Sequence, residues 1–439
     1  STGFSTPTNA TASTNNGLTF LSTLQNPFSG GIAPSPGAAL GLMTFAGTEL
    51  TTTNATGSTT FLLPHNRKNA SYSRFIVGLQ RELPGKIGFE ATYIYSHGSD
   101  LGVSRELNAV PTQYLNNFAG VTNGNTIIDS IATVNNFMTP TVSNPFRTLI
   151  PLSSAWNGNT IARRRLLVPF PQFGNVAVQE YNGTSDYQSL QLQFVKRFTK
   201  GLSLNGSYSF SREHDKTRYL NPQDTDLVDI VSPTERPHRF TASGIYELPI
   251  GKGRAIGSDW HPAADAIIGG WQIQGVYEWQ SGEPLSFGNI YYAGDPANLV
   301  SLLGKKDSQG RRYGIDIPAF DTAGFTVTYT DPITLVVTQR VPSFGNNYSS
   351  SSSANTLRNF PLTTGSFRNQ RFLKFDVGIS KNFRIREGMK VQVRVEAINI
   401  LNKPYFSGLN LDPTNAAFGR ANTQRQPPRD IQIGGRFTF

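Results

Sequence analysis

Residue types that carry catalysis or bind metals are few in this chain, and they are widely spaced. It has 439 residues, with five histidines and no cysteine. The lack of cysteine excludes disulfides, thiolate metal sites and cysteine nucleophiles. His238, in "RPHRF", is expected as a polar residue at a loop end. The histidines show no metal-ligand spacing, and they are His65, His97, His214, His238 and His261.

Three further clusters of charged residues suggest weak sites at most. Asp224, Asp226 and Asp229 could bind Ca²⁺, but they lack the glycine and the distal glutamate of an EF-hand loop. The stretch "GKGR" lacks the spacing of a phosphate-binding loop. Arg163–Arg165 is either a solvated loop cluster or a contact for anionic groups. Because no Ser/His/Asp set or paired carboxylates stand out, we predict no enzyme activity and no cofactor.

The composition favours a protein made of many strands. Aromatic residues make up 11% and charged residues only 15%, and there are 42 glycines. The formal net charge of +10 comes from scattered basic residues, which argues against a nucleic-acid partner. No apolar run approaches the roughly 20 residues of a membrane-spanning helix. The chain is therefore expected to be all-β, with polar loops between the strands.

Apolar and polar residues alternate with a period of two in paired segments. In "LQLQFVKRFTKGLSLNGSYSF", Leu190 and Leu192 share one face with Tyr208 and Phe210, and mostly polar side chains occupy the other. This pattern predicts a hairpin with one apolar and one polar face. It recurs in nine expected strands. Short turns are expected near 83–86, 199–201 and 383–388, and long connections at 97–184, 214–236 and 282–370. The connection 401–428 is intermediate, and 249–269 is a longer connection on the short-turn side that departs from the pattern.

Short turns that alternate with long loops are typical of an antiparallel transmembrane β-barrel. A soluble sandwich or propeller also alternates, but loops of this length are unusual in a compact soluble domain. We therefore expect 1–70 to be a loop-rich extracellular segment, with one weak strand in "GAALGLMTFAG", and 71–439 to be barrel strands and loops.

The alternation assigns roles to particular side chains. The row expected to line the lumen is Asp376, Lys390, Gln392, Arg394 and Glu396. Aromatic residues on the apolar face, many near strand ends, are expected to contact lipid; they are Tyr93, Tyr95, Tyr208, Phe210, Tyr246, Trp271, Tyr277 and Trp279. The chain ends in a further alternating strand with Ile431, Ile433, Gly435, Phe437 and Phe439.

Several longer stretches resemble one family. They include "SRFIVGLQRELPGKIGFEATYIYSHGSDL", "RPHRFTASGIYELPIGKGR", "GGWQIQGVYEWQSGEPLSF" and "VEAINILNKPYF". They resemble the C-terminal barrel region of TonB-dependent outer-membrane receptors, in the Oar-like, carboxypeptidase-regulatory-like branch of acidobacteria. The likeness covers most of 65–439. The terminal strand also resembles the assembly signal that the barrel-insertion machinery reads.

The resemblance implies a barrel of about 22 strands with an upstream plug, of which nine strands would be the final portion. It implies uptake of a bulky solute such as a glycan, peptide or chelate. Implied partners are outer-membrane lipid, lipopolysaccharide, the barrel-assembly machinery and the TonB system, the last through an upstream region not in this chain. The alternative is a cleaved surface protein that assembles through its strand edges into fibres or sheets.

Overall fold

The computed structural model describes residues 12–32, 67–116, 124–149, 156, 158–174, 176–342, 355–386 and 388–439. Two compact units are present. One comprises 1–67, 104–115 and 133–180, and the other comprises 68–103, 116–132 and 181–439. Most of 1–70, including the weak strand expected in "GAALGLMTFAG", lies outside the described residues.

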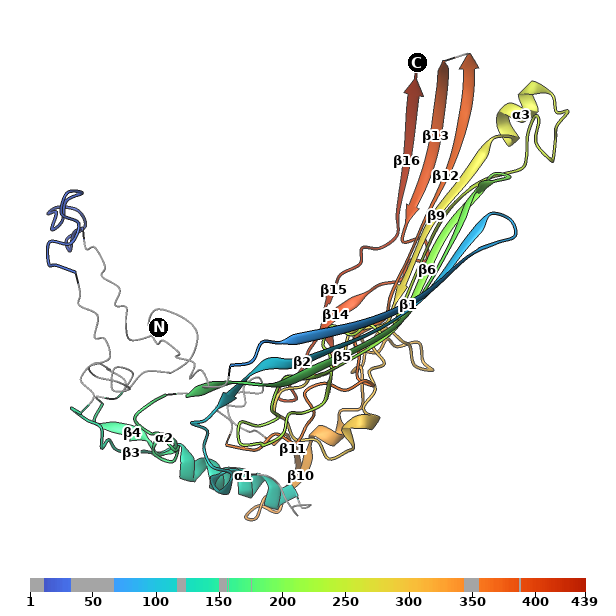
Figure 1. Ribbon diagram of the computed structural model, residues 1–439. Helices are drawn as coiled ribbons and strands as arrows, with labels where there is room; N and C mark the ends of the chain where they lie inside the picture. The colour runs from blue at the N-terminus through green and yellow to red at the C-terminus, as the bar shows by residue number, and fades with distance from the viewer. Residues whose placement is uncertain are drawn as a thin grey trace. The chain divides into compact units, whose positions relative to one another are not determined.

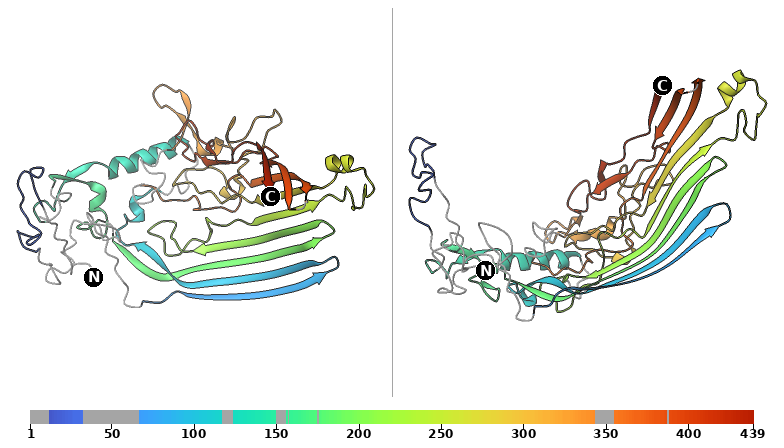
Figure 2. Two further views of the ribbon diagram at one scale, coloured as in Figure 1. Left: turned by 90° about the horizontal axis from the view of Figure 1, so that it is seen from above. Right: turned by 45° about the horizontal axis from the view of Figure 1, so that its top comes forward.

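Nine long strands form one antiparallel sheet, in agreement with the number expected from the alternation (Figures 1 and 2). Each strand pairs with the next long strand along the chain, and the short β7 (Ile230–Val231) pairs only with β6. Within the described residues, β1 and β16 are the two edges of the sheet. The strands are β1 (Ser71–Leu83), β2 (Ile87–Glu106), β5 (Ala177–Thr199), β6 (Leu202–Lys216), β8 (His238–Glu247), β9 (Trp271–Gln280), β12 (Phe372–Arg386), β13 (Met389–Ile398) and β16 (Asp430–Thr438).

The short turns lie where the sequence predicts them, and their residues explain why they are tight. Lys200 and Gly201 both have positive φ, at 51° and 82°, as a two-residue turn with the twist of a hairpin requires. Gly85 and Lys86 also have positive φ, as does Gly388. All three turns lie at the same end of the sheet, which we call the turn end.

Connections at the opposite end, the loop end, are longer, but their bounds differ from those expected. β2 and β5 extend into the range 97–184, so the connection between them is 107–176. Period-two alternation fades in these extensions, which is why the pattern ended the strands early. This connection contains η2 (Thr112–Tyr114), α1 (Gly124–Met138), β3 (Thr141–Ser143), β4 (Thr160–Ala162) and α2 (Arg163–Leu166).

The connections 281–371 and 399–429 are not the plain polar loops that the sequence suggests. They contain short elements and share an aromatic core. Phe325 and Phe367 are almost completely buried there, and Phe287 packs against both. We call this cluster the loop core. Its buried members are Phe287, Ile290, Leu299, Leu303, Ala319, Phe320, Phe325, Phe360, Phe367, Phe406 and Leu409.

The short elements in these connections complete the description. The pairs β10 (Val327–Thr330) with β11 (Val337–Arg340), and β14 (Phe406–Leu409) with β15 (Ala421–Gln424), form two small hairpins. The 3₁₀ turns η4 (Pro296–Asn298) and η5 (Ala323–Phe325) lie between them and β9. At the turn end, residues 248–270 contain α3 (Pro262–Ile268). Among the described helices, none is long and apolar enough to cross a membrane.

Candidate functional site

Strand register divides the sheet into an apolar face and a polar face. Residues directly opposite each other point to the same side. Val395 lies opposite both Ile379 and Ile433, so three strands place aliphatic side chains on one face. Gln392 lies opposite Arg436 and also Asn382 on the other face. The face predicted to be apolar and the face predicted to be polar are thus the two sides of one continuous sheet.

All five residues predicted to line the lumen share the polar face of β12 and β13. Asp376 Oδ2 accepts a 2.6 Å bond from Lys374 Nζ, while its Oδ1 accepts the backbone N–H of Asn399 at 2.8 Å. The Arg394 guanidinium lies 3.8 Å from the Glu396 carboxylate. Gln392 and Lys390 complete this row, at the end nearer the turn. The row is therefore a partly neutralised polar wall, and its role as a lumen lining remains a prediction.

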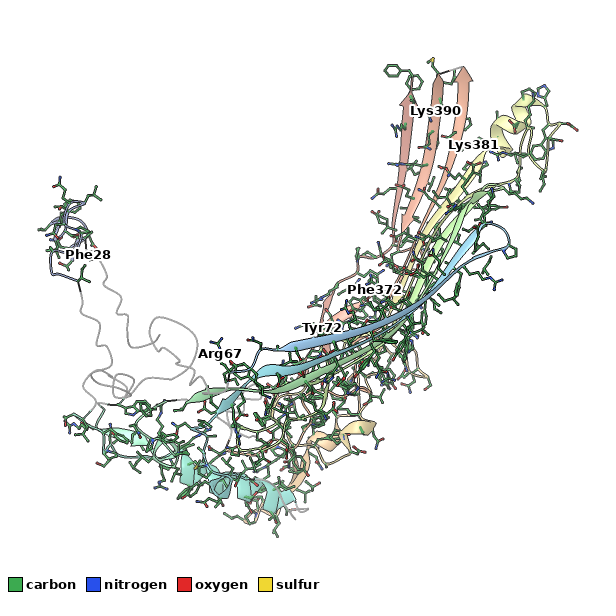
Figure 3. The ribbon with its side chains drawn as sticks, viewed as in Figure 1. Phe28, Arg67, Tyr72, Phe372, Lys381 and Lys390 are labelled. Carbon is green, nitrogen blue, oxygen red and sulfur yellow. The ribbon has the colours of Figure 1, made fainter. Side chains whose placement is uncertain are left out.

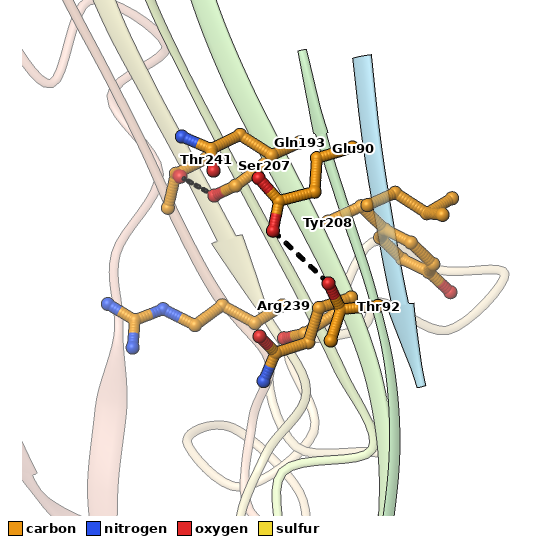
Figure 4. Close-up of a pocket in the computed structure, with 10 residues that line it drawn as sticks. Glu90, Thr92, Gln193, Ser207, Tyr208, Arg239 and Thr241 are labelled. Carbon is orange, nitrogen blue, oxygen red and sulfur yellow. Dashed lines mark hydrogen bonds between the residues drawn. The ribbon is translucent and has the colours of Figure 1, made fainter. Parts of the chain in front are cut away.

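A pocket of about 320 Å³ opens on the same face, farther along the sheet (Figure 4). Thr92 donates to Glu90 at 3.2 Å, and the hydroxyls of Ser207 and Thr241 lie 2.7 Å apart. Arg239 also lines this pocket. Within the described part of the chain, no hydrogen bond or ion pair involves the Arg239 guanidinium. The pocket therefore offers hydroxyls, a carboxylate and an available cation to a hydrophilic solute.

Sequence reasoning singled out the last polar row and missed this pocket. The signal was present, because 191, 193, 207, 209, 239 and 241 are alternate polar positions on three strands. A second pocket, of about 600 Å³, lies between the first pocket and the polar wall. Its lining includes Asn205, Gln274, Asp376 and Glu396. Pockets thus continue along this face of the sheet, and the lining of the second is more apolar than polar.

The predicted lipid-contact aromatics lie on the apolar face, where many touch one another. Tyr208 and Phe210 pack around His238, whose ring centroid is 5.0 Å from that of Phe210 and 6.1 Å from that of Trp279. The Tyr208 hydroxyl lies 2.8 Å from His238 Nδ1. His238 is therefore part of an aromatic cluster at the loop end. His238 begins β8, where the loop meets the strand as the sequence predicts, and the register adds that it lies opposite Phe210.

The other aromatics extend this face in both directions. Tyr277 contacts Phe240 and Phe375 at centroid distances of 5.8 and 5.9 Å. Trp271 lies at the turn end, opposite Lys381, whose Nζ is 5.5 Å from the Trp271 ring centroid. Tyr93, Tyr95 and Tyr246 lie opposite Val77, Phe75 and Ile273, respectively.

The C-terminal strand presents its apolar side chains without cover. Ile433 is 78% exposed and Phe439 is 91% exposed, although Phe437 stacks on Phe439 at 5.7 Å. Ile431, Gly435 and Phe437 lie opposite Ala397, Val393 and Val391 of β13. An uncovered row of this kind is unfavourable in water. The strand therefore has the pattern expected of an assembly signal, and that role stays a prediction.

Two ion pairs fasten the connections at the loop end to the sheet. Glu235, whose side chain is completely buried, pairs with Arg368. Arg236, the next residue, pairs with Glu283, which also accepts from Asn369 Nδ2 at 2.9 Å. The first pair joins the segment before β8 to the segment before β12, and the second joins it to the segment after β9. These contacts hold the loops in a fixed place over the strand ends.

A half-buried arginine, Arg358, organises the loop core. The Arg358 guanidinium donates to the carbonyl oxygens of Phe287 and Phe360, both at 2.7 Å, and of Pro361 at 2.9 Å. Burial lowers the pKa of Arg358 to about 10. The guanidinium remains a cation at neutral pH and donates hydrogen bonds to three carbonyl oxygens at once.

The acidic residues considered as a weak Ca²⁺ site bond to other groups of the protein. Asp224 Oδ2 accepts the backbone N–H of Asn221 at 2.7 Å, and Asp229 pairs with His214 at 3.0 Å. No group of three His, Asp or Glu side chains in the described ranges is placed to hold a metal ion. In the other unit, Arg163 and Arg165 lie over the rings of Phe137 and Trp156.

Comparison with known proteins identifies the family. The family model described as "Outer membrane beta barrel domain" matches residues 1–432. This chain belongs to that family. It is accordingly an all-β protein of the bacterial outer membrane, with an antiparallel sheet as its barrel wall. Among curated proteins, none matches the chain.

Solved structures similar to this barrel domain include outer-membrane transporters and receptors. The transporter YddB from Escherichia coli is 10% identical with a TM-score of 0.35, over 85% of this chain and 33% of that chain. The FrpB iron transporter from Neisseria meningitidis is 12% identical with a TM-score of 0.34, over 87% and 33%. The ferripyoverdine receptor from Pseudomonas aeruginosa is 9% identical with a TM-score of 0.33, over 84% and 27%. The chain spans about a third or less of these proteins.

Proposed function

We propose that this barrel domain belongs to a TonB-dependent receptor of the Oar-like branch, which takes up a bulky hydrophilic solute. The observation that carries the proposal is the two-faced sheet. Nine strands keep an apolar face toward one side and a polar face with open pockets toward the other. A barrel wall between lipid and an aqueous path requires this division.

In this account the apolar face contacts lipid and the aromatic cluster at the loop end lies in the membrane interface. The polar wall and the pocket around Arg239 line the path of the solute. The loop core gives the connections at the loop end a fixed shape, so they can form a binding surface for a glycan, a peptide or a chelate. Lipopolysaccharide would surround this end.

The proposed partners act at different places. The strand from Asp430 to Thr438 would be read by the barrel-assembly machinery. TonB would be engaged by a region outside these 439 residues. We propose no nucleic-acid partner, no cofactor and no catalytic step.

The test is solute binding and uptake by cells that carry the native protein or a variant. Cells would be offered labelled oligosaccharides, peptides and ferric chelates, and uptake would be compared with and without TonB. We expect TonB-dependent uptake of one class. Arg239→Ala should reduce it because the cation of the pocket is lost, whereas Lys252→Ala, at the exposed turn end, should not. Uptake that is equal without TonB would contradict the proposal.

The alternative function, self-assembly at the cell surface, is favoured by one observation. All thirteen residues of the edge strand β1 are exposed, and an exposed edge can pair with another chain. Native size measurement in mild detergent distinguishes the two. Fibres or sheets would support assembly, and discrete particles of one barrel would exclude it.

A further inference from the structure

The connection between β8 and β9 differs from the other described connections at the turn end. Residues 248–270, which we call the rim segment, replace a tight turn with a folded loop and the helix α3. His261 Nδ1 accepts from the backbone of Ala263 at 3.3 Å, and Asp265 Oδ1 accepts from the backbone of Lys252 at 2.6 Å. The rim segment is thus held by its own hydrogen bonds.

Two side chains from the apolar face of the sheet donate to carbonyls at the end of α3 and just after it. Lys381 Nζ donates to the carbonyl of Gly269 and, at 3.4 Å, to that of Asp265. Trp271 Nε1 donates to the carbonyl of Ile267 at 3.1 Å. Lys381 lies opposite Trp271 and Val393, on the apolar face. The end of α3 therefore rests against the same face that carries the lipid-contact aromatics; Figure 3 labels Lys381 beside this segment.

Lys381 is unusual for a lysine, since only 2% of it is exposed. Its ammonium also lies near the rings of Trp271 and Phe383, at 5.5 and 5.2 Å from their centroids. A charged group is buried only where partners repay its lost hydration. Water could satisfy the last carbonyls of a helix at an aqueous surface. Side-chain donors to the carbonyls of Gly269 and Ile267, beside the backbone bond from Gly269 to Asp265, suit a helix end where water is scarce.

The rim segment exposes three isoleucines, together with polar residues such as Lys252 and Asp259. Ile267 is 72% exposed, Ile268 is 49% exposed and Ile256 is 54% exposed. Ile267 and Ile268 lie just before Trp271, which begins β9 on the apolar face. Exposed aliphatic residues beside a helix end that side chains of the sheet cap fit the boundary of a bilayer, where acyl chains meet headgroups.

We propose that the rim segment is a membrane-interface anchor, in which Ile267 and Ile268 insert into the lipid leaflet at the turn end while Lys381 and Trp271 hold the helix against the barrel wall. The occupant of this surface is lipid. The inference rests on the proposed contact between the apolar face and lipid, and adds to it a non-strand element that enters the leaflet.

The test uses single cysteines, which this cysteine-free chain allows without background labelling. The protein would be purified from outer membranes and placed in phosphatidylethanolamine and phosphatidylglycerol vesicles. An environment-sensitive fluorophore would be attached in the variants Ile267→Cys, Val395→Cys and Ser308→Cys. These report the rim segment, the middle of the apolar face and an exposed loop position. The vesicles would also contain lipids that carry a nitroxide either near the headgroup or deep in the acyl chain. Each nitroxide quenches most strongly the probes that lie at its own depth.

We expect the probe at 267 to be shifted to the blue and quenched most by the shallow nitroxide, about 5–10 Å below the headgroup boundary. The probe at 395 should be quenched most by the deep nitroxide, and the probe at 308 should not be quenched. A probe at 267 that behaves like the one at 308 would overturn the anchor and leave the barrel proposal standing. Loss of quenching at 395 as well would overturn both.

A second variant tests the role of Lys381. In Lys381→Met, the carbonyl of Gly269 loses its side-chain donor, and the carbonyl of Asp265 keeps the backbone N–H of Gly269 at 2.9 Å. We expect the probe at 267 to lose its blue shift while the probe at 395 keeps its quenching, which shows that the barrel has folded. An unchanged blue shift at 267 would mean that Lys381 does not hold the anchor.

Discussion

At the scale of single residues, buried charges and positions with positive φ decide which substitutions the sheet tolerates. Glu235 and Arg368 form the most buried ion pair in the described residues, with side-chain exposures of 0% and 16%. Neither residue stands out in the sequence, because they are 133 positions apart. Their importance follows from the fold, which brings the segment before β8 against the segment before β12.

Glu235→Gln should destabilise the barrel by about 3–5 kcal/mol, because it leaves the Arg368 cation without its carboxylate. The matched control is Glu247→Gln, which breaks the exposed pair with Arg254 at 2.9 Å and should cost at most about 1 kcal/mol. Urea unfolding in detergent, followed by tryptophan fluorescence, measures both. Equal losses in the two variants would contradict this difference.

Gly201→Ala should destabilise the β5–β6 hairpin by about 1–3 kcal/mol. Gly201 has a φ of +82°, and an added Cβ would lie 2.8 Å from the carbonyl oxygen of Glu247. Gly310→Ala is the control, since Gly310 has a φ of +80° with nothing within 4 Å. The same unfolding measurement should show a smaller loss for Gly310→Ala. If the two losses were equal, backbone strain alone would account for the effect at Gly201.

At the scale of elements, the sequence predicted the strands well and the connections poorly. Period-two alternation located all nine long strands because their two faces meet different surroundings, as in β12 and β13. The loop core was missed because its aromatic residues come from distant turns without a period. Phe287, Phe325 and Phe367 meet only after the chain has folded. The sequence pattern located only part of the candidate site. The polar row near Glu396 lies in a hairpin with clear alternation, whereas Arg239 does not lie in such a hairpin.

Arg358→Met should loosen the loop core while the sheet remains folded. Three carbonyls lose their donor, and each buried acceptor left without a partner costs about 1–3 kcal/mol. We expect faster cleavage of 281–371 by protease, with unchanged heat-modifiable migration of the barrel in gels. Arg311→Met, which removes an exposed guanidinium paired with Asp307, is the control and should leave the cleavage rate nearly unchanged. Protection equal to that of the native protein would refute this role of Arg358 in the loop core.

At the scale of the whole molecule, the described sheet has the properties of a barrel wall. It has three short turns and the rim segment at one end, folded connections at the other, and a polar face with two pockets. Family membership places it in the outer membrane. The account therefore depends on one claim: the apolar face meets lipid and the polar face meets water.

The most direct measurement of that claim is a cysteine scan along β13 in vesicles. Each residue from Val391 to Glu396 would be replaced in turn, and its reactivity toward a membrane-impermeant maleimide would be compared with quenching of an attached fluorophore by nitroxide lipids. The account predicts a period of two. Val391, Val393 and Val395 should be quenched by lipid and protected from the maleimide, and Gln392, Arg394 and Glu396 should show the reverse. Uniform reactivity along the strand, or lipid quenching on the polar face, would contradict it.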